Sequence, residues 1–309
     1  MAAGGRAKDA EALAARLEEH PDYRVLRRLD ASVECPGLAG SRIGEAVILD
    51  TETTGTDPGT DKVIELAVVR FEYCRATGAA GRVLEVYDGL EDPGVPIPPE
   101  STAIHGITDE MVRGQRLDEA AIARLVDGAA LVIAHNAGFD RRYGEQRLPL
   151  FASLPWACSR QEVPWAELGL GVAKLEYLAY RYGFFFDGHR AEMDCRALLE
   201  VLRRPIPGQP EAGSALRLLL ESARAPSLRI WAIGSPFETK DVLRARGYRW
   251  EPEKRVWYRD LGPAAELASE LEWLKGAVYA GKGASVEVET FDAWSRYSGR
   301  EGKKERVRL

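Results

Sequence analysis

Residues 46–55 read AVILDTETTG, an apolar run that ends in two acidic residues and a turn. Apolar and β-branched residues in an unbroken run predict a buried β-strand. Because side chains alternate along a strand, positions two apart project from the same face. Asp50 and Glu52 are therefore expected to point together from the end of this strand.

Two more acidic positions follow similar signals further along the chain. Residues 131–140 read LVIAHNAGFD, which predicts a second buried strand that breaks at Asn136 and leads into a helix carrying Asp140. Residues 189–194 read HRAEMD and begin a segment with one apolar helical stripe, made of Met193, Ala197, Leu198, Val201 and Leu202. Asp194 is thus expected on a helix, with His189 on the approach to it.

Four carboxylates brought to one point would repel one another unless cations lie between them. Hard divalent ions such as Mg²⁺ or Mn²⁺ prefer carboxylate oxygens, and a pair of them about 3.5–4 Å apart can hold both the attacking and leaving oxygens of a phosphoryl displacement. An imidazole with a pKa of about 6.5 can take the proton of an attacking water near neutral pH. The set predicts two divalent metal ions and a phosphodiester substrate.

Each position also has an ordinary interpretation when it is taken alone. An acidic pair such as Asp50 and Glu52 commonly marks a solvated strand end. Asp140 would serve as a helix-capping residue, since Asp near a helix start offsets the macrodipole. His189 would be a surface loop histidine. Their order, on the expected element types, favours the joint interpretation as a site.

The combined pattern resembles the DEDDh branch of the RNase H-like 3′-to-5′ exonucleases, which includes proofreading subunits of bacterial replicative DNA polymerases. The matching motifs are Asp50-x-Glu52-x-Thr54-Gly55, residues 135–140 as His-Asn-x-x-Phe-Asp, and His189 separated by four residues from Asp194. Residues 104–108, Ile-His-Gly-Ile-Thr, are similar to the substrate-pocket loop of that family. The resemblance covers residues 45–203.

The resemblance implies roles for individual residues. Asp50, Glu52, Asp140 and Asp194 would bind the two metal ions, Mg²⁺ or Mn²⁺, and His189 would be the general base. Thr53, Thr54 and His105 would lie near the terminal nucleotide, although His105 can also be read as a hydrogen-bonded loop histidine. His135, at a strand end, is read as structural.

The predicted activity is hydrolysis of terminal phosphodiesters at the 3′ ends of DNA, with single strands as the expected substrate and nucleoside monophosphates as the product. Two alternatives stay open at this point. The same residues would serve a 3′-to-5′ exoribonuclease, because only a contact to the 2′-OH distinguishes the sugars. The chain can also be read as a non-catalytic binding protein of a polymerase or repair complex. Proofreading would need a polymerase partner in trans.

Composition and charge are compatible with this expectation. The net charge of the chain is −6, but residues 227–309 carry 16 Lys and Arg against 13 Asp and Glu, so the acidic excess lies in the remainder. Cys35, Cys74, Cys158 and Cys195 show no paired spacing, which predicts neither disulfides nor a zinc site. No apolar run is long enough to cross a membrane and no signal peptide is apparent, so a cytoplasmic enzyme is expected.

The expected fold class is α/β, a mixed five-stranded sheet flanked by helices, with a small α+β accessory domain at the C-terminus. Strands are expected near 45–51, 62–73, 82–88, 130–135 and 155–159, and helices near 172–182 and 215–224. Four segments are predicted: an N-terminal helical extension (1–44), the exonuclease domain (45–203), a linker with a bridging helix (204–226) and a tryptophan-rich accessory domain (227–309). A fragment ending in the linker is expected to fold.

The accessory segment holds five of the seven tryptophans of the chain. Residues 248–259 alternate basic and aromatic side chains, which can form a stacking and phosphate platform for single strands. The other interpretation is that Trp231, Trp250 and Trp257 make the core of a small domain. The second interpretation is favoured for each tryptophan.

Overall fold

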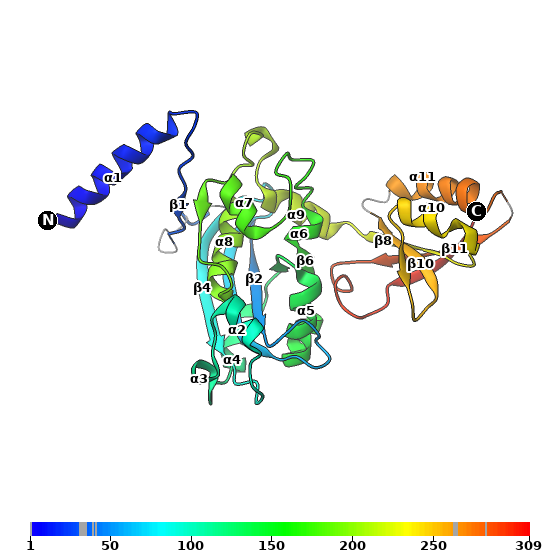
Figure 1. Cartoon of the computed structure of the whole chain (residues 1–309), viewed down its shortest axis with the longest axis horizontal. Coiled ribbons are helices and arrows are strands. Elements are labelled where there is room, and N and C mark those ends of the chain that lie inside the picture. The colour runs from blue at the N-terminus through cyan, green and yellow to red at the C-terminus, as the bar shows by residue number, and fades with distance from the viewer. Residues whose placement is uncertain (1, 31–35, 39, 41, 262–264, 282) are drawn as a thin grey trace.

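The structure, a computed structural model, describes residues 2–30, 36–38, 40, 42–261, 265–281 and 283–309. Two five-stranded sheets dominate these residues, and each sheet has its own helices (Figure 1). The first sheet lies in the half that holds the predicted site. The second is built from the tryptophan-rich segment.

The first sheet is mixed, as the sequence predicts. Its strand order is β4-β3-β2-β5-β6. The strands are β2 (Ile43–Thr53), β3 (Val63–Cys74), β4 (Ala80–Leu90), β5 (Val132–Ala134) and β6 (Trp156–Cys158). β2 pairs antiparallel with β3 and parallel with β5, and β5 pairs parallel with β6. All five expected strands are confirmed within a few residues.

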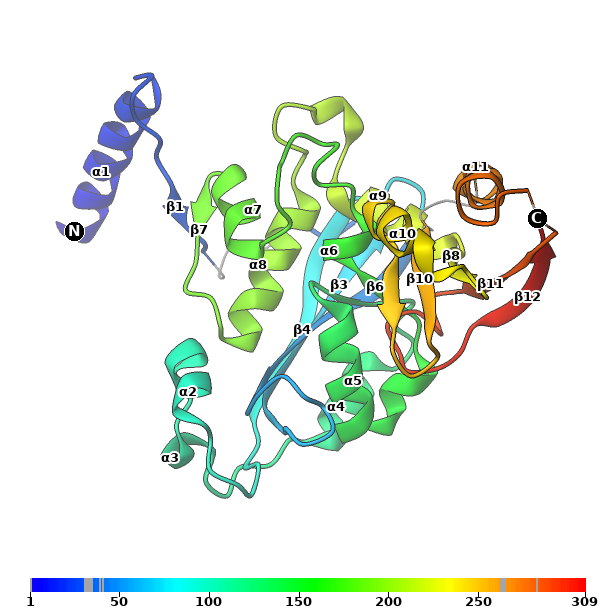
Figure 2. The same ribbon diagram turned by 45° about the vertical axis from the view of Figure 1, so that its right-hand side comes forward.

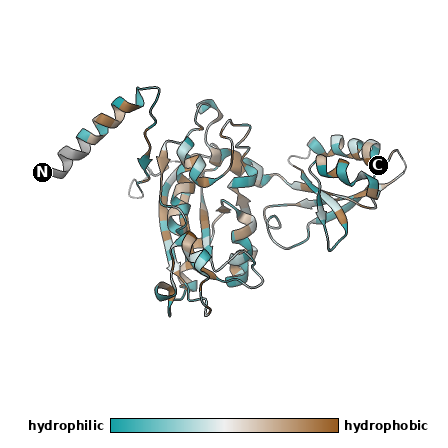
Figure 3. Ribbon diagram, in the orientation of Figure 1, coloured by the Kyte–Doolittle hydropathy of each residue, from teal (hydrophilic) through white to brown (hydrophobic). Residues whose placement is uncertain are grey.

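Helices cover both faces of this sheet (Figure 2). α7 (Leu175–Arg181), α8 (Ala191–Arg203) and α9 (Ala215–Arg224) pack against the face that includes Ala46 and Ile48. α4 (Glu119–Val126) and α5 (Ala137–Arg147) pack against the opposite face. Hydrophobic residues gather on the central strands (Figure 3), because both faces of the sheet are buried.

Short elements complete this half of the chain. They are α2 (Pro99–His105), α3 (Asp109–Val112), η1 (Pro149–Ser153), α6 (Ser159–Glu162), β7 (Phe184–Phe185) and η2 (Pro210–Ala212). Helix α9 lies at the residues expected for a bridging helix, and its apolar face is buried in the same core as α8.

The second sheet is antiparallel and has the order β12-β11-β8-β10-β9. Its strands are β8 (Ser227–Ala232), β9 (Arg249–Glu251), β10 (Val256–Leu261), β11 (Ser285–Phe291) and β12 (Lys303–Arg308). The helical segments of this part are η3 (Phe237–Thr239), α10 (Lys240–Ala245), α11 (Ala265–Trp273) and η4 (Leu274–Val278). A separate hydrophobic cluster holds them together. We call residues 227–309 the C-terminal module.

The tryptophans of the C-terminal module differ in their environment. Trp231 is 3% exposed, and its indole N–H donates to Glu289 at 2.8 Å, so the core interpretation is confirmed for this residue. Trp257 is half-buried at the edge of the core. Trp250 is 48% exposed and does not follow the core interpretation.

The N-terminal extension forms α1 (Ala2–Glu18) and β1 (Arg27–Arg28), and β1 pairs with β7. α1 stands away from both sheets (Figure 1), and its apolar residues Leu13 and Leu17 are exposed. Among the described residues, no helix is long and apolar enough to span a membrane. Cys74, Cys158 and Cys195 are free thiols, and Cys35 lies outside the described residues.

Candidate metal centre

Strand β2 carries the first two carboxylates of the site. Asp50 and Glu52 share the face of β2 that also bears Ala46 and Ile48, which is the face covered by α8. The apolar part of the strand is fully buried, and this fixes the register that turns both carboxylates toward α8. The predicted orientation of the acidic pair is therefore present in the structure.

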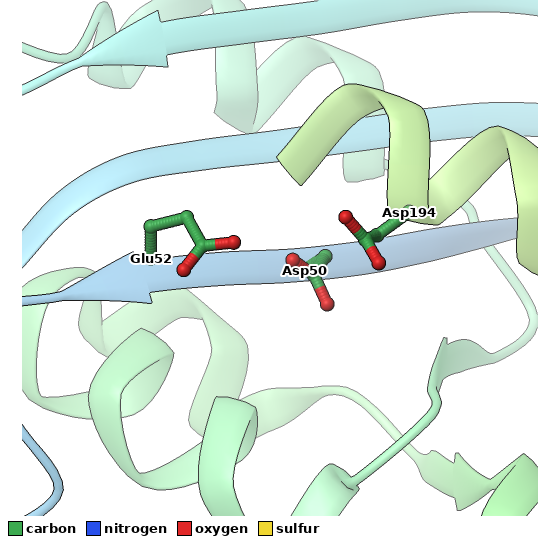
Figure 4. Close-up of side chains that lie close together, drawn as sticks. All are labelled: Asp50, Glu52 and Asp194. Atoms are coloured by element: carbon green, nitrogen blue, oxygen red, sulfur yellow. The ribbon is translucent and has the colours of Figure 1, made fainter. Parts of the chain in front are cut away.

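Helix α8 brings Asp194 to the same point. Ligand oxygens of Asp50, Glu52 and Asp194 all lie within 4.8 Å of one another, and the three carboxylates converge between β2 and α8 (Figure 4). Asp194 lies in the first turn of α8, and its Oδ2 accepts the backbone N–H of Arg190, the helix cap, at 3.1 Å. This bond fixes the start of the helix as well as the carboxylate.

Asp140 reaches the site from the other face of the sheet, on α5. Strand β5 ends at Ala134, so β2 has no partner strand on that side beyond Ile48. The free backbone N–H of Thr51 donates to Asp140 Oδ1 at 3.1 Å, and the Thr51 hydroxyl donates to the same oxygen at 2.9 Å. Asp140 is thus held at the pocket wall, next to the three converging carboxylates.

Burial makes these carboxylates hard to ionise in the protein alone. It raises the pKa of Glu52 from its ordinary 4.5 to about 8, with Asp194 and Glu65 adding repulsion. Burial, followed by the charges of Asp140, Asp194 and Glu52, also raises the pKa of Asp50 well above its usual range. The pKa values of Asp140 and Asp194 rise for the same first reason. A bound cation would relieve this cost.

The donor set fits hard divalent cations. All of its contributing atoms are carboxylate oxygens, which Mg²⁺ and Mn²⁺ prefer, and no thiol or imidazole of the described chain joins the three-residue cluster. The raised pKa values show that the fold holds these groups at a cost that positive charge would offset. The arrangement can therefore hold metal ions against a phosphate.

His189 lies on the loop that enters α8. Its backbone adopts φ 64°, a left-handed conformation that is uncommon outside glycine. The side chain is 52% exposed, and its Nε2 lies 3.8 Å from Glu176 Oε1. Both residues line the pocket that contains the carboxylates, so the imidazole stands at the edge of the site, open to solvent.

The pocket above the carboxylates has a volume of about 740 Å³. Besides Phe139 of the sequence motif, its wall includes two cationic residues, Arg160 and Lys174, and one further aromatic residue, Tyr177. Positive side chains next to an acidic cluster suit a ligand whose phosphates extend beyond the metal ions. The pattern of the sequence did not identify these three residues.

The expected substrate-contact residues lie outside the lining of this pocket. The hydroxyl of Thr53 donates to Gly55 O at 2.6 Å, and that of Thr54 lies 3.2 Å from Asp61 Oδ1. His105 is 5% exposed, and its Nδ1 accepts the Ile107 N–H at 3.0 Å, as in the loop interpretation. The role of these three residues at a terminal nucleotide stays a prediction.

His135 has the structural role that the sequence suggested. Its Nδ1 lies 2.9 Å from Ser159 Oγ and its Nε2 lies 2.8 Å from Ala173 O. Burial lowers its pKa to about 4, so the ring is neutral at physiological pH. These bonds tie the end of β5 to the start of α6 and to the segment before α7.

The sequence patterns did not identify Glu65 and Arg190 as part of the site. Glu65 is 1% exposed on β3, directly opposite Glu52, and it accepts Arg190 Nη2 at 2.6 Å and the Ala191 N–H at 2.9 Å. It therefore anchors the first turn of α8 to the sheet. A signal existed in the sequence, because a glutamate within the apolar run VIELAVV needs a partner when it is buried.

Comparison with known proteins places this site in a family. A sequence model of the family described as Exonuclease matches residues 47–202, about half of the chain. The chain is 33% identical over 164 residues to the DNA polymerase III subunit epsilon of Treponema pallidum, covering 49% of this chain and 72% of that protein. It is 42% identical over 106 residues to a DNA polymerase III subunit epsilon-like protein of Rhodobacter capsulatus, covering 31% of this chain.

Some relatives are far longer than the matched region. The chain spans 14% of the Rhodobacter capsulatus protein. It spans 12% of the DNA polymerase III PolC-type of Thermotoga maritima, with 30% identity over 177 residues and 53% of this chain.

Solved structures with a similar chain trace include exonucleases. Exonuclease X in complex with 5′ overhanging duplex DNA has a TM-score of 0.41 at 26% identity, covering 56% of this chain and 97% of that one. Exonuclease I of E. coli in complex with a dA16 oligonucleotide has a TM-score of 0.48 at 15% identity, covering 74% of this chain and 66% of that one. The family match covers the strands and helices that carry all four carboxylates, and the chain belongs to the exonuclease family.

Proposed function

We propose that this protein is a metal-dependent 3′-to-5′ exonuclease that removes nucleoside monophosphates from single-stranded DNA ends. The observation that carries the proposal is the convergence of Asp50, Glu52 and Asp194 in a pocket that also receives Asp140 and His189. The family membership and the DNA polymerase names of the relatives support DNA as the substrate.

In this proposal the four carboxylates hold two divalent ions, Mg²⁺ or Mn²⁺. When bound, such ions supply charge stabilisation for the attacking and leaving oxygens. The chain itself orients the scissile phosphate beneath the pocket opening. Arg160 and Lys174 are placed to contact further phosphates of the strand, and Tyr177 is placed to stack on a base.

His189 would remove the proton of the attacking water at an imidazole nitrogen and release it to solvent. The exposure of its ring supports this role, because a general base must pass its proton on after each turnover. Glu176, 3.8 Å away, would stabilise the imidazolium that forms. Thr53, Thr54 and His105 remain proposed neighbours of the terminal nucleotide, although they lie outside the pocket lining.

The same proposal includes a setting for the enzyme. The relatives named as polymerase subunits support a polymerase or repair complex as the partner, with proofreading in trans. We also infer a cytoplasmic location, which the free thiols of Cys74, Cys158 and Cys195 support.

The test is degradation of labelled single-stranded DNA, duplex DNA and RNA of one sequence, each with Mn²⁺, with Mg²⁺ and with EDTA. We expect single-stranded DNA to be shortened from its 3′ end, and EDTA to stop the reaction. Faster degradation of RNA would identify an exoribonuclease instead.

The variant that tests the metal site is Asp50→Ala. It should abolish turnover while the protein stays folded, because removing a carboxylate from the cluster also removes repulsion. A rate within about threefold of the parent protein would show that the assigned metal site is wrong, since loss of a metal ligand costs far more.

A further inference from the structure

The loop between β11 and β12, residues 292–302, leaves the C-terminal module and packs on the nuclease half. We call it the bracing loop. Ala293 is 5% exposed, and its carbonyl accepts the backbone N–H of Trp156 in β6 at 2.7 Å. The loop is therefore joined to the sheet that carries the metal centre.

Arg141 connects the bracing loop to α5. It follows Asp140 directly in the sequence and is completely buried. Its Nη1 donates to Arg296 O at 2.6 Å and to Ala293 O at 3.2 Å, and its Nη2 donates to Trp294 O at 2.6 Å. Three carbonyls of the bracing loop thus hold one guanidinium group, and bonds from a charged donor are stronger than neutral ones.

Arg296 makes the reverse connection, from the bracing loop to the nuclease half. Its Nη1 lies 2.7 Å from Glu162 Oε2, and both side chains are 6% exposed. Its Nη2 donates to Ala225 O just beyond α9, where helix carbonyls lack partners. Glu162 also accepts the Cys158 N–H at 2.8 Å and the Tyr297 hydroxyl at 3.0 Å. Two buried arginines, one from each side, close the contact.

Helix α5 needs such support more than its neighbours do. Its sequence, AGFDRRYGEQR, contains two glycines and few apolar residues, so helix propensity contributes little and its apolar contacts to the core come mainly from Ala137 and Tyr143. The bonds at its first turns come from Thr51 to Asp140 and from Arg141 to the bracing loop. Adjacent residues thereby tie α5 to the sheet on one side and to the C-terminal module on the other.

We propose that the bracing loop positions the metal-binding carboxylate of Asp140 through Arg141, which makes the C-terminal module a part of the nuclease site. This inference rests on the proposed function of the site. Arg141 is a positioning residue, since it touches neither the substrate nor the metal ions. It also follows that a fragment ending in the 204–214 segment would lose the three carbonyl partners of Arg141 and keep only its pair with Glu145, whereas the sequence predicts that such a fragment folds.

The test uses the full chain with Arg141→Lys and, as a matched control, Arg142→Lys. Lysine keeps the charge of Arg141 but lacks the planar fork that reaches three carbonyls. We expect Mn²⁺ affinity, measured by calorimetry, to fall by about tenfold, because outer contacts of ligands typically contribute 10- to 100-fold. The turnover number should fall as well, while KM for a short oligonucleotide stays within about twofold. Arg142 is exposed on the same helix, and its variant should match the parent.

Arg296→Lys tests the contact from the other side and should change Mn²⁺ affinity in the same direction. If both variants melt at lower temperature but keep the parental Mn²⁺ affinity and turnover number, the bracing loop is only a structural support and the inference is overturned. If the parent protein itself neither binds Mn²⁺ nor cleaves DNA, the proposed function has failed and this inference fails with it. A functional parent with parent-like variants overturns the positioning role alone.

Discussion

His189 combines an exposed ring with a left-handed backbone conformation. Any test of its role must separate the effect of losing the ring from the effect on the backbone. A left-handed backbone costs roughly 1–2 kcal/mol for most residues other than glycine, and asparagine tolerates the conformation better than alanine. His189→Asn should therefore lower turnover by about 10²-fold or more, because a general base contributes roughly 10²–10⁴. Single-turnover assays with calorimetry of Mn²⁺ binding check this. Lost metal binding would instead make His189 a ligand or an orienting residue.

The carboxylates of the metal centre also predict how stability depends on pH. The pKa of Glu52 rises from 4.5 in an unfolded chain to about 8 in the fold, so the folded protein keeps a proton that the unfolded chain releases. Without metal, stability should then fall as the pH rises from about 4.5 to 8. Each 1 kcal/mol lost would lower Tm by about 2–4 °C in a domain of this size.

Thermal unfolding in EDTA across this pH range measures the effect. Mn²⁺ should restore stability most at the alkaline end, because there it no longer competes with protons. Glu52→Gln should flatten part of the metal-free profile. A flat profile in the parent protein would contradict the raised pKa that burial and repulsion give Glu52.

The sequence predicted that Asp50, Glu52 and Asp194 meet, because the first two follow from strand alternation and the third from a helix with a clear apolar stripe. Asp140 followed from its place just after a buried strand. The sequence did not predict which contacts hold these carboxylates in place. The Thr51 N–H is free for Asp140 only because β5 stops at Ala134, and a strand length of that kind depends on the whole sheet. Pocket residues such as Arg160 and Lys174 lie on short loops and short helices without periodicity, so no pattern marks them.

At the scale of elements, the placement of α8 depends on one buried glutamate. Glu65 bonds both the side chain of Arg190 and the first helical N–H, and it thereby takes the place of an N-cap. Breaking a buried pair costs about 3–5 kcal/mol, but the Arg190 side chain is 45% exposed and can regain water, so we expect about 2 kcal/mol for Glu65→Gln. Turnover should fall too, since Asp194 lies in the same turn.

Urea unfolding provides the measurement for this change. The matched control is Glu221→Gln, which breaks the Arg217–Glu221 pair on α9, where both side chains are about half exposed. Pairs of that kind contribute about 0.2–1 kcal/mol. If Glu65→Gln costs no more than the control, the anchor assigned to α8 does not exist.

Helices were predicted well where the apolar spacing was regular and less well where tertiary contacts determine the ends of the helix. α9 was expected between residues 215 and 224 and lies there, because its apolar spacing is regular. The helix expected over 172–182 begins only at Leu175, and residues before it include Ala173, whose carbonyl bonds His135. That bond joins residues distant in sequence, and no local sequence pattern predicts it.

At the scale of the whole molecule, the C-terminal module presents an exposed aromatic–basic strip, made of Phe237, Lys240, Arg244, Trp250 and Trp257. Lys240 Nζ lies 4.2 Å from the ring centre of Phe237, and the rings of Trp250 and Trp257 are 5.5 Å apart. Phe237 and Trp250 are 75% and 48% exposed. This geometry suits bases that stack on rings between phosphates held by cations.

Phe237→Ala and Trp250→Ala should weaken binding of long single-stranded DNA by about 1–3 kcal/mol each, since stacking contributes that much per base. Turnover on a short oligonucleotide should not change. Fluorescence anisotropy at several salt concentrations measures the affinity, with Tyr23→Ala as an exposed aromatic control in the N-terminal extension. Unchanged affinity would favour a protein partner for the strip.

The sequence predicts two halves of the chain, and in the structure each half has its own hydrophobic cluster. It could not show that they are joined. The bonds of Arg141 to the bracing loop link residues more than 150 positions apart, and they end on backbone carbonyls, which carry no sequence signal. The division of the chain into four segments stays a prediction.

The contact of Ala293 with β6 has one more consequence. β6 is one of the two outermost strands of the first sheet, and an outermost strand with free amide groups favours pairing with another copy of the chain. Here the backbone N–H of Trp156 donates to the carbonyl of Ala293, and the backbone N–H of Cys158 donates to the Glu162 side chain. The bracing loop therefore also protects this edge against aggregation. A chain without the bracing loop would be prone to pair with other copies through the edge of β6.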